Sequence, residues 1–377
     1  FQLPIACVLI TGSIIIMRQL DFLTNRPLGF EKDQIITVPL FSQNVNGIFR
    51  QNDSTYRNRL KNFRNIIEAQ TGVFKTALSS SPPGLGAMFR GTIPEGFTSE
   101  DNLFIANLSV DYDFHETYNI KLLAGRAFSR NYGTDPSSAF IVNETAVREF
   151  NWESPEKAIG RTINREGKKG EVVGVIRDFH FMSLTTAVSA MVLELNPNQF
   201  NTLSIRLDQA DPGPVLEKIE VQWATLFPEK AFEYTFLDEQ LTEQYRNFRN
   251  FGLIIQSFTI VAILIACLGV YGLVLFVVQR KVKEIGVRKV LGATMGNILR
   301  MIYRDFAWLM LIGFVLAIPL SYYLLNEWLL NFTYHISIDI LTYAISLMVL
   351  VMTVTMTIGY QAVKASLANP VASLRSE

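Results

Sequence analysis

The chain has 377 residues, of which 49% are hydrophobic and 18% are charged, below the roughly 25% of charged residues in ordinary soluble domains. Its 34 basic and 34 acidic residues cancel, so the net charge indicates no nucleic-acid partner. The apolar residues concentrate toward the two ends, which predicts a membrane protein with a soluble insert. Cys7 and Cys267 both lie in apolar runs, so the insert has no disulfide, zinc-binding cysteine or cysteine nucleophile.

The first apolar run covers residues 1–17 and is shorter than the roughly 20 residues that span a bilayer. No basic region or small-residue cleavage site accompanies it, so a cleaved signal peptide is not expected. We interpret residues 1–19 as a truncated transmembrane helix and the sequence as a fragment of a longer chain. Arg18, Gln19 and Asp21 are expected to carry this helix into water.

Residues 20–250 alternate short β-branched runs with amphipathic runs, which predicts an α+β domain. We expect two lobes, the second inserted at about residues 80–170, and we expect Asn143 to cap a helix. Strands are predicted at residues 34–40, 73–78, 104–110, 139–142, 171–177, 190–195, 202–207 and 231–236, and helices at residues 54–70, 111–118, 144–150 and 212–226.

Three further transmembrane helices are predicted at residues 251–279, 303–325 and 341–363. A polar helix at residues 237–250 is expected to run straight into the first of them as a stalk. The turn at residues 326–340 contains Glu327 and Asp339 but no Lys or Arg. It should therefore face outside, opposite the basic segment described next, and this orientation places the insert outside and both termini in the cytoplasm.

The segment at residues 280–294, RKVKEIGVRKVLGAT, contains five basic residues and one acid, Glu284. An apolar stripe of Val287, Val290 and Leu291 predicts a short helix, and Gly292 is expected to end it because glycine accepts the left-handed conformation. The basic charge suits ordinary anchoring on anionic lipid, whereas the stripe suits docking into a partner's groove. From the residues alone, lipid anchoring and docking are equally well supported.

Catalytic motifs are absent from the sequence. It has no Walker A loop, no H-E-x-x-H and no G-x-S-x-G, so no enzyme activity is predicted for this chain. Asp178 and His180 could share a strand face and bind a metal or relay a proton, but we favour a polar pair that caps a turn, since a metal needs three or four ligands. Uncharged polar residues in the apolar helices favour helix packing over a permeation pathway; these are Gln256, Ser257, Thr259, Tyr271, Ser321, Thr353, Thr355 and Thr357.

Several segments carry a resemblance to a known family. KEIGVRKVLGAT at residues 283–294 resembles the signature after the second membrane helix of MacB/FtsX-like ABC transporter permeases. The resemblance covers nearly the whole chain. Four other segments are similar to parts of the large permeases common in Bacteroidetes: VDYDFHETYNIKLLAGRAFS (110–129), IVNETAVREFNW (141–152), GEVVGVIRDFHF (170–181) and YQAVKASLANPVASLR (360–375).

This resemblance implies a fold and a location. Residues 20–250 would form a periplasmic MacB-like core domain, with a porter-like subdomain and an inserted lobe. Residues 251–377 would form an FtsX-like permease domain with a coupling loop at residues 280–300, in the bacterial inner membrane. The opening of the chain looks like the start of the second of two four-helix repeats, and a stand-alone four-helix subunit is the alternative.

The resemblance also implies partners. A separate cytoplasmic ATPase would hold ATP and Mg²⁺, and this chain would hold no cofactor or metal. The other expected partners are a second permease repeat or subunit, a periplasmic adaptor, an outer-membrane protein or a hydrolase, and membrane lipid. The coupling role falls on Glu284, Ile285, Gly286, Arg288, Lys289, Leu291 and Gly292.

Two functions are compatible with this family. In the first, the chain couples ATP hydrolysis to motion of the external domain, which exports or releases an envelope substrate (mechanotransmission or efflux). In the second, the chain is a membrane scaffold whose external domain activates a cell-wall hydrolase. The sequence does not separate them.

Overall fold

The computed structural model describes residues 2–40, 54–101, 103–209, 211–281, 284, 287–288 and 291–367. The chain forms two compact units. The helical unit comprises Phe1–Asn25 and Tyr245–Glu377, and the α+β unit comprises Arg26–Gln244. The described residues therefore include an α+β domain between the first and second apolar helices, as predicted.

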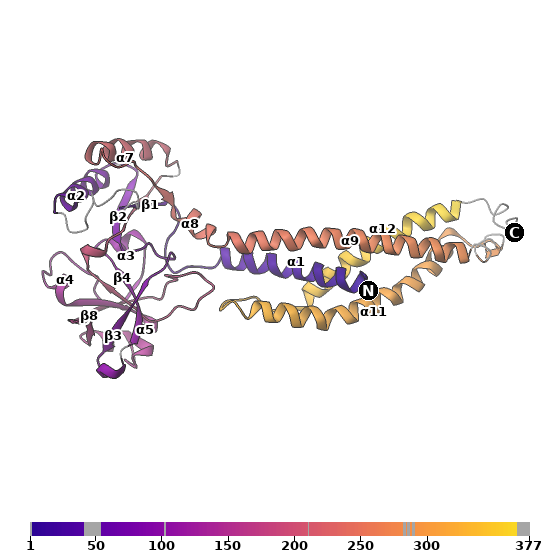
Figure 1. Ribbon diagram of the computed structural model, residues 1–377, viewed down its shortest axis with the longest axis horizontal. Coiled ribbons are helices and arrows are strands. Elements are labelled where there is room, and N and C mark those ends of the chain that lie inside the picture. The colour runs from indigo at the N-terminus through magenta and orange to yellow at the C-terminus, as the bar shows by residue number, and fades with distance from the viewer. Residues whose placement is uncertain are drawn as a thin grey trace. The chain divides into compact units, whose positions relative to one another are not determined.

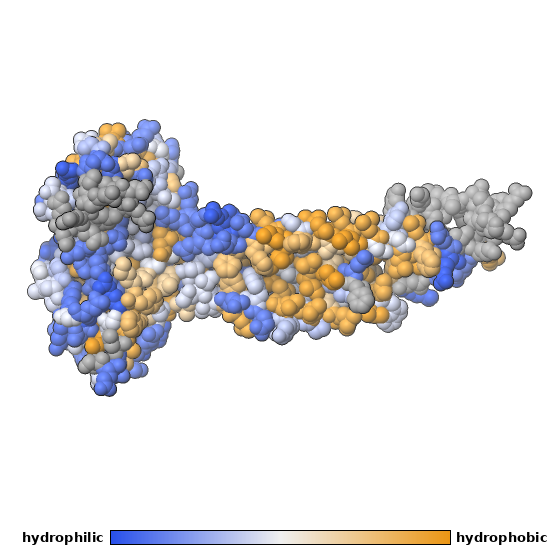
Figure 2. All heavy atoms as spheres, viewed as in Figure 1, coloured by the Kyte–Doolittle hydropathy of each residue, from blue (hydrophilic) through white to orange (hydrophobic). Residues whose placement is uncertain are grey.

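Among the described residues, the helical unit contains four long helices (Figure 1). They are α1 (Gln2–Thr24), α9 (Arg246–Arg280), α11 (Met295–Leu329) and α12 (Ile340–Leu367). Among the described residues, these four are long and apolar enough to cross a membrane. Their outer surface is also apolar (Figure 2), with side chains such as Leu268, Leu316 and Met348 largely exposed. Helices that are apolar all round suit a lipid environment, in which the helical backbone satisfies its own hydrogen bonds.

Helix α1 contacts each of the other three helices. Ala6 and Cys7 lie in a buried cluster with Val270, Phe306 and Leu350. Hydroxyl groups add bonds between helices: Thr11 Oγ1 donates to Ser346 Oγ over 3.0 Å and Thr259 Oγ1 lies 3.1 Å from the Leu9 carbonyl. These bonds favour the packing interpretation of the polar residues in the helices.

Of the three residues predicted to carry the end of α1 into water, Arg18 and Asp21 are exposed but Gln19 is buried. Gln19 is only 1% exposed, because its amide donates to the Tyr334 carbonyl and accepts from the Ile336 backbone, both at 2.9 Å. Arg18 forms two hydrogen bonds with Asp339, at 3.0 and 3.2 Å. The hydrogen bond from Arg18 lowers the pKa of Asp339, and further bonds from Thr342 act in the same direction. The prediction failed at Gln19 because the turn that it binds is over 300 positions away in the sequence.

The first lobe of the α+β unit is built on a four-stranded antiparallel sheet in the order β11-β1-β10-β2. Its strands are β1 (Ile35–Pro39), β2 (Val73–Ser79), β10 (Thr202–Leu207) and β11 (Thr235–Phe236). Helices α2 (Ser54–Glu68) and α7 (Gly213–Leu226) bury Phe63 and Trp223 against Ile36 and Val38 of β1. The neighbouring Ile35 belongs to a different core, as the alternation of side chains along a strand requires.

The second lobe is built on a seven-stranded mixed sheet in the order β5-β8-β6-β9-β4-β3-β7. We expected this lobe at about residues 80–170, whereas its strands run from Met88 to Glu194. They are β3 (Met88–Pro94), β4 (Leu103–Ser109), β5 (Leu122–Gly125), β6 (Ala139–Asn143), β7 (Thr162–Arg165), β8 (Lys168–Ile176) and β9 (Met191–Glu194), with short helices α3 (Phe114–Thr117), α4 (Asp135–Ser138), α5 (Glu144–Glu149) and α6 (Pro155–Ala158).

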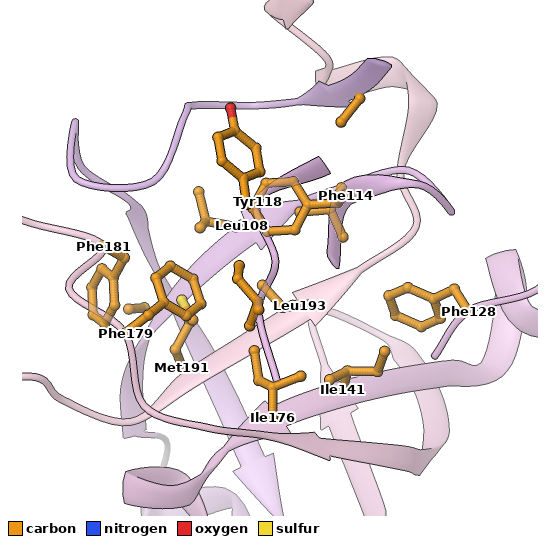
Figure 3. Packing of buried hydrophobic residues seen from close by; sticks show 14 of the residues in the cluster. Leu108, Phe114, Tyr118, Phe128, Ile141, Ile176, Phe179, Phe181, Met191 and Leu193 are labelled. Carbon is orange, nitrogen blue, oxygen red and sulfur yellow. The ribbon is translucent and has the colours of Figure 1, made fainter. Parts of the chain in front are cut away.

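The two lobes share a hydrophobic core. Phe114, Tyr118, Phe179 and Leu193 of the second lobe lie in it (Figure 3), together with Ile35 of the first. The Tyr118 hydroxyl also donates to Ser204 Oγ of β10 over 2.5 Å. This shared core makes the lobes parts of one folded unit.

Strands β3, β5 and β7 were not predicted. Strand β7 pairs with β8 through a two-residue turn in which Glu166 and Gly167 both have positive φ, 47° and 87°. This is the geometry of a type I′ hairpin turn, and the Glu-Gly sequence is a weaker signal for it than Asn-Gly.

The stalk is two helices rather than one. Helix α8 (Leu237–Glu243) ends before Gln244, and α9 begins at Arg246 after a two-residue turn. The Gln244 side chain donates to the Gly84 carbonyl over 2.8 Å. The turn at residues 244–245 separates α8 from α9.

Replacing Trp223 with Ala should destabilise the first lobe strongly. Its ring is fully buried against Phe63 and Phe227, and its indole N–H donates to the Lys230 carbonyl over 2.9 Å. We expect a loss of about 3–5 kcal/mol, measured as thermal or denaturant unfolding of the full chain in detergent. Val221→Ala on the same helix is the control, since Val221 is exposed, and a similar loss in both variants would contradict this packing.

Candidate functional site

The basic segment connects α9 to α11. Lys281 follows the last residue of α9, and its N–H donates to the Val277 carbonyl over 3.0 Å. Thr294 precedes α11 as its N-cap residue. Between them, Glu284, Val287 and Arg288 are helical, in agreement with the short helix that the sequence predicts.

An ion pair lies along this helix. Arg288 Nη2 is 2.8 Å from Glu284 Oε1, at i, i+4 spacing, with about half of each side chain exposed. Exposed pairs of this kind contribute only about 0.3–0.5 kcal/mol. The pair therefore balances the charge of Glu284 and orders Arg288, but it contributes little to the stability of the segment.

Gly292 ends the helix, as predicted. Its φ is +88°, and the Ala293 N–H donates back to the Arg288 carbonyl over 2.9 Å. This bond from the second residue past the helix end is typical of a Schellman motif. A Cβ atom at Gly292 would meet nothing within 4 Å, so the requirement for glycine is conformational rather than steric.

The helix exposes apolar side chains. Leu291 is 80% exposed and Val287 is 50% exposed, and the Leu291 N–H donates to the Val287 carbonyl, so the two lie one turn apart. A basic surface with two exposed aliphatic side chains suits either lipid or a protein groove. Of the residues assigned a coupling role, Glu284, Arg288, Leu291 and Gly292 lie here, whereas Ile285, Gly286 and Lys289 fall outside the described residues, as does Val290.

Asp178 and His180 belong to no cluster that could hold a metal ion within the part of the chain that the structure describes. Asp178 accepts hydrogen bonds from the Thr145 backbone and hydroxyl at 3.0 and 2.7 Å, so it caps helix α5 beside Asn143, which accepts from Ala146 at 3.0 Å. Burial lowers the pKa of His180 to about 4, which keeps it neutral at pH 7. Among the described residues, no three His, Cys, Asp or Glu side chains are placed to hold a metal ion.

A charged cluster that the sequence did not reveal lies where the two lobes meet. Arg64 on α2 of the first lobe is 2.8 Å from Asp111 and 3.1 Å from Asp113 of the second lobe. Arg130 is 2.6 Å from Asp113. The side chains of Arg64 and both aspartates are largely buried. Because its members are far apart in the sequence, no local pattern could have identified the cluster.

The two aspartates respond to this environment in opposite ways. Burial raises the pKa of Asp111 to about 6, although Arg64 opposes the change. Burial also acts to raise the pKa of Asp113, but the hydrogen bond from Arg130 and the nearby cations bring it below its ordinary value. The cluster can therefore take up a proton at Asp111 under mildly acidic conditions while Asp113 remains ionised.

Asp111→Asn should change the pH dependence of stability. Because the pKa of Asp111 is higher in the folded chain, its stabilising contribution is full below pH about 4 and is lost as the pH rises through about 6. Relative to the variant, the wild type should therefore be more stable at pH 5 than at pH 7.5, by about 1.4 kcal/mol, measured by thermal unfolding of the full chain in detergent. Asp208→Asn, at an exposed carboxylate, is the control. An identical difference at both pH values would contradict the assignment.

Comparison with known proteins places the basic segment inside a recognised domain. Residues 257–370 match the model of the family described as FtsX-like permease C-terminal. The chain is 24% identical over 226 residues to the macrolide export ATP-binding/permease protein MacB of Chromobacterium violaceum, covering 57% of this chain and 34% of that protein. It is also 24% identical over 213 residues to the uncharacterized ABC transporter permease YknZ of Bacillus subtilis, covering 54% and 53%.

Two solved structures are similar to parts of the chain. The periplasmic region of MacB from Actinobacillus actinomycetemcomitans matches 58% of this chain and 95% of its own length, with 13% identity and a TM-score of 0.37. The extracellular domain of YknZ matches 46% and 87%, with 14% identity and a TM-score of 0.34. The matches to MacB of C. violaceum and to YknZ span about a third and a half of those proteins. Residues 257–370 therefore match the FtsX-like permease family, and parts of the chain are similar in sequence to MacB and YknZ.

Proposed function

We propose that this chain is a permease subunit of an ABC transporter in the bacterial inner membrane, which couples ATP hydrolysis on a separate cytoplasmic ATPase to motion of the α+β unit. The observation that carries this proposal is the exposed aliphatic pair Val287 and Leu291 on a short basic helix between two apolar helices. Lipid or a protein groove would each bury the 80% exposed Leu291 favourably, and the match of this segment to the FtsX-like permease family supports the groove.

The energy source would lie in the partner. The sequence has no Walker A loop, and the family match covers the basic segment. ATP and Mg²⁺ would therefore bind the ATPase, and this chain would contribute its docking helix. Glu284, Ile285, Gly286, Arg288, Lys289, Leu291 and Gly292 would form the contact. A second permease repeat or subunit would supply the other half of the membrane assembly.

The orientation follows from charge. The basic segment and the turn around Asp339, which has no Lys or Arg among residues 326–340, lie at opposite ends of α11. The positive-inside rule places the basic end in the cytoplasm. With this orientation the α+β unit lies in the periplasm and both ends of the chain lie in the cytoplasm, where the ATPase can reach the docking helix.

Leu291→Asp should weaken the complex with the ATPase. A central aliphatic anchor in an interface contributes about 2 kcal/mol or more, so we expect at least a tenfold loss of affinity, measured by copurification and by ATP turnover of the co-expressed pair. Arg288→Glu should act in the same direction. Leu330→Asp is the control, because Leu330 is similarly exposed at the other end of α11. An intact, active complex with Leu291→Asp would contradict the docking role.

The orientation can be checked with engineered cysteines. In a background in which Cys7 and Cys267 are replaced by Ala, we expect His335→Cys and Glu149→Cys to react with an impermeant maleimide added to intact spheroplasts. Ala293→Cys should react only after the membrane is permeabilised. Labelling of Ala293→Cys in intact spheroplasts would reverse the orientation.

A further inference from the structure

Most strands of the second lobe close on themselves. Strands β8, β6, β9, β4, β3 and β7 are hydrogen-bonded in that order, and β7 also pairs with β8. Ile105, Phe140 and Val192 meet Ile163 of β7 in one buried apolar cluster. Arg165 ends β7 two residues after Ile163, so it lies on the same face of the strand. A charged side chain is therefore placed at the end of this apolar cluster.

Arg165 is buried with only part of its guanidinium paired. Its side chain is 2% exposed, and its Nη1 donates to Asn107 Oδ1 over 2.5 Å. Its Nε and Nη2 are also buried, and neither has a hydrogen-bond partner among the described residues. These two nitrogens form one edge of the guanidinium, which can donate to two oxygens of a carboxylate or phosphate at once. A buried donor without a partner is costly, so a ligand that accepts from both nitrogens would stabilise the fold.

The charges around Arg165 also favour an anion. Glu194 is shared by two cations, since its carboxylate lies 4.0 Å from Arg165 Nη1 and 3.8 Å from Lys168 Nζ. Arg90 pairs with Glu166 over 2.6 Å. These five side chains form a barrel-end cluster of three cations and two carboxylates. Burial lowers the pKa of Arg165, Glu194 opposes the change, and the charge of Arg90 adds to it. A bound anion would balance the excess positive charge.

We propose that the barrel-end cluster binds a small oxyanion, of the size of phosphate or acetate, on Nε and Nη2 of Arg165. The ion would reach this edge past Lys168 and Arg90, whose side chains are 23% and 22% exposed. A free ion suits this place better than a lipid head group, because the two nitrogens themselves are fully buried. The site lies outside the docking helix and gives the α+β unit a ligand of its own.

The test measures binding of radiolabelled inorganic phosphate to the full chain in phosphatidylcholine nanodiscs, by equilibrium dialysis against empty nanodiscs. We expect saturable binding that sulfate and acetate displace, whereas chloride at the same ionic strength does not. Arg165→Lys keeps the charge but cannot donate to two oxygens from one planar edge. It should weaken phosphate binding at least about tenfold.

Two neighbouring lysines provide a matched pair of variants. Lys168→Gln removes one cation of the cluster and should weaken phosphate binding about threefold to tenfold. Lys169→Gln removes the same charge from the next residue, which is exposed and lies on the opposite face of β8, and it should leave binding unchanged. Thermal unfolding checks that each variant is folded, and if Arg165→Lys is not, the two lysine variants still decide.

Three results would overturn the proposal. Absence of saturable binding to the wild type would mean that water alone satisfies Arg165. Equal binding by Lys168→Gln and Lys169→Gln would place the phosphate elsewhere on the chain. Equal displacement by chloride would show that the site does not select an oxyanion. None of these results depends on an ATPase, so the docking proposal stands or fails separately.

Discussion

The helical unit is organised by one constraint: every polar group in an apolar environment needs a hydrogen-bond partner. Its helices satisfy their backbone groups internally, so the few polar side chains among them must find partners on neighbouring helices or on their own backbone. Thr11 reaches Ser346 and Thr259 lies within reach of the Leu9 carbonyl, while Thr353 donates to the carbonyl four residues earlier. The bonds between different helices favour particular helix neighbours, whereas the Thr353 bond only satisfies its own hydroxyl group.

In the α+β unit, two lobes that are each built on a separate sheet must be joined. A shared apolar core joins the lobes, and burial of such a core is the main favourable contribution to folding. The ion pairs of Arg64 with Asp111 and Asp113 also link the lobes. They favour one relative orientation of the lobes, because guanidinium and carboxylate groups pair only in a restricted geometry. The same arginine also lines a pocket of about 380 Å³ beside α2.

Much of this architecture could be predicted from local patterns. The β-branched run around Ile36 and the amphipathic spacing of Leu60 and Phe63 identified their elements correctly, because each depends on residues close together in the sequence. Asn143 and Gly292 were also predictable, since capping depends on the side chain or its absence at one position. Strands such as β5 and β7 were missed because four residues carry too little periodicity.

The candidate site was predictable to a similar extent. Its basic charge, its helix and its termination at Gly292 follow from the sequence, whereas the 80% exposure of Leu291 required the fold, because exposure depends on what the rest of the chain leaves uncovered. Contacts between distant segments were invisible for the same reason. Arg64 with Asp111 and Gln19 with Tyr334 are examples.

The side chain of Gln19 restricts the rotation of α1 about its own axis. Its amide donates to the Tyr334 carbonyl and accepts from the Ile336 N–H. The side chain thus pairs with the backbone of the turn in the way that a neighbouring β-strand would. Successive residues of a helix are about 100° apart around its axis, so turning α1 by a single residue would break both bonds and bury an unsatisfied amide. Gln19 therefore fixes the rotational phase of α1 relative to the turn before α12, and any movement that α1 makes as a rigid helix must carry this turn with it.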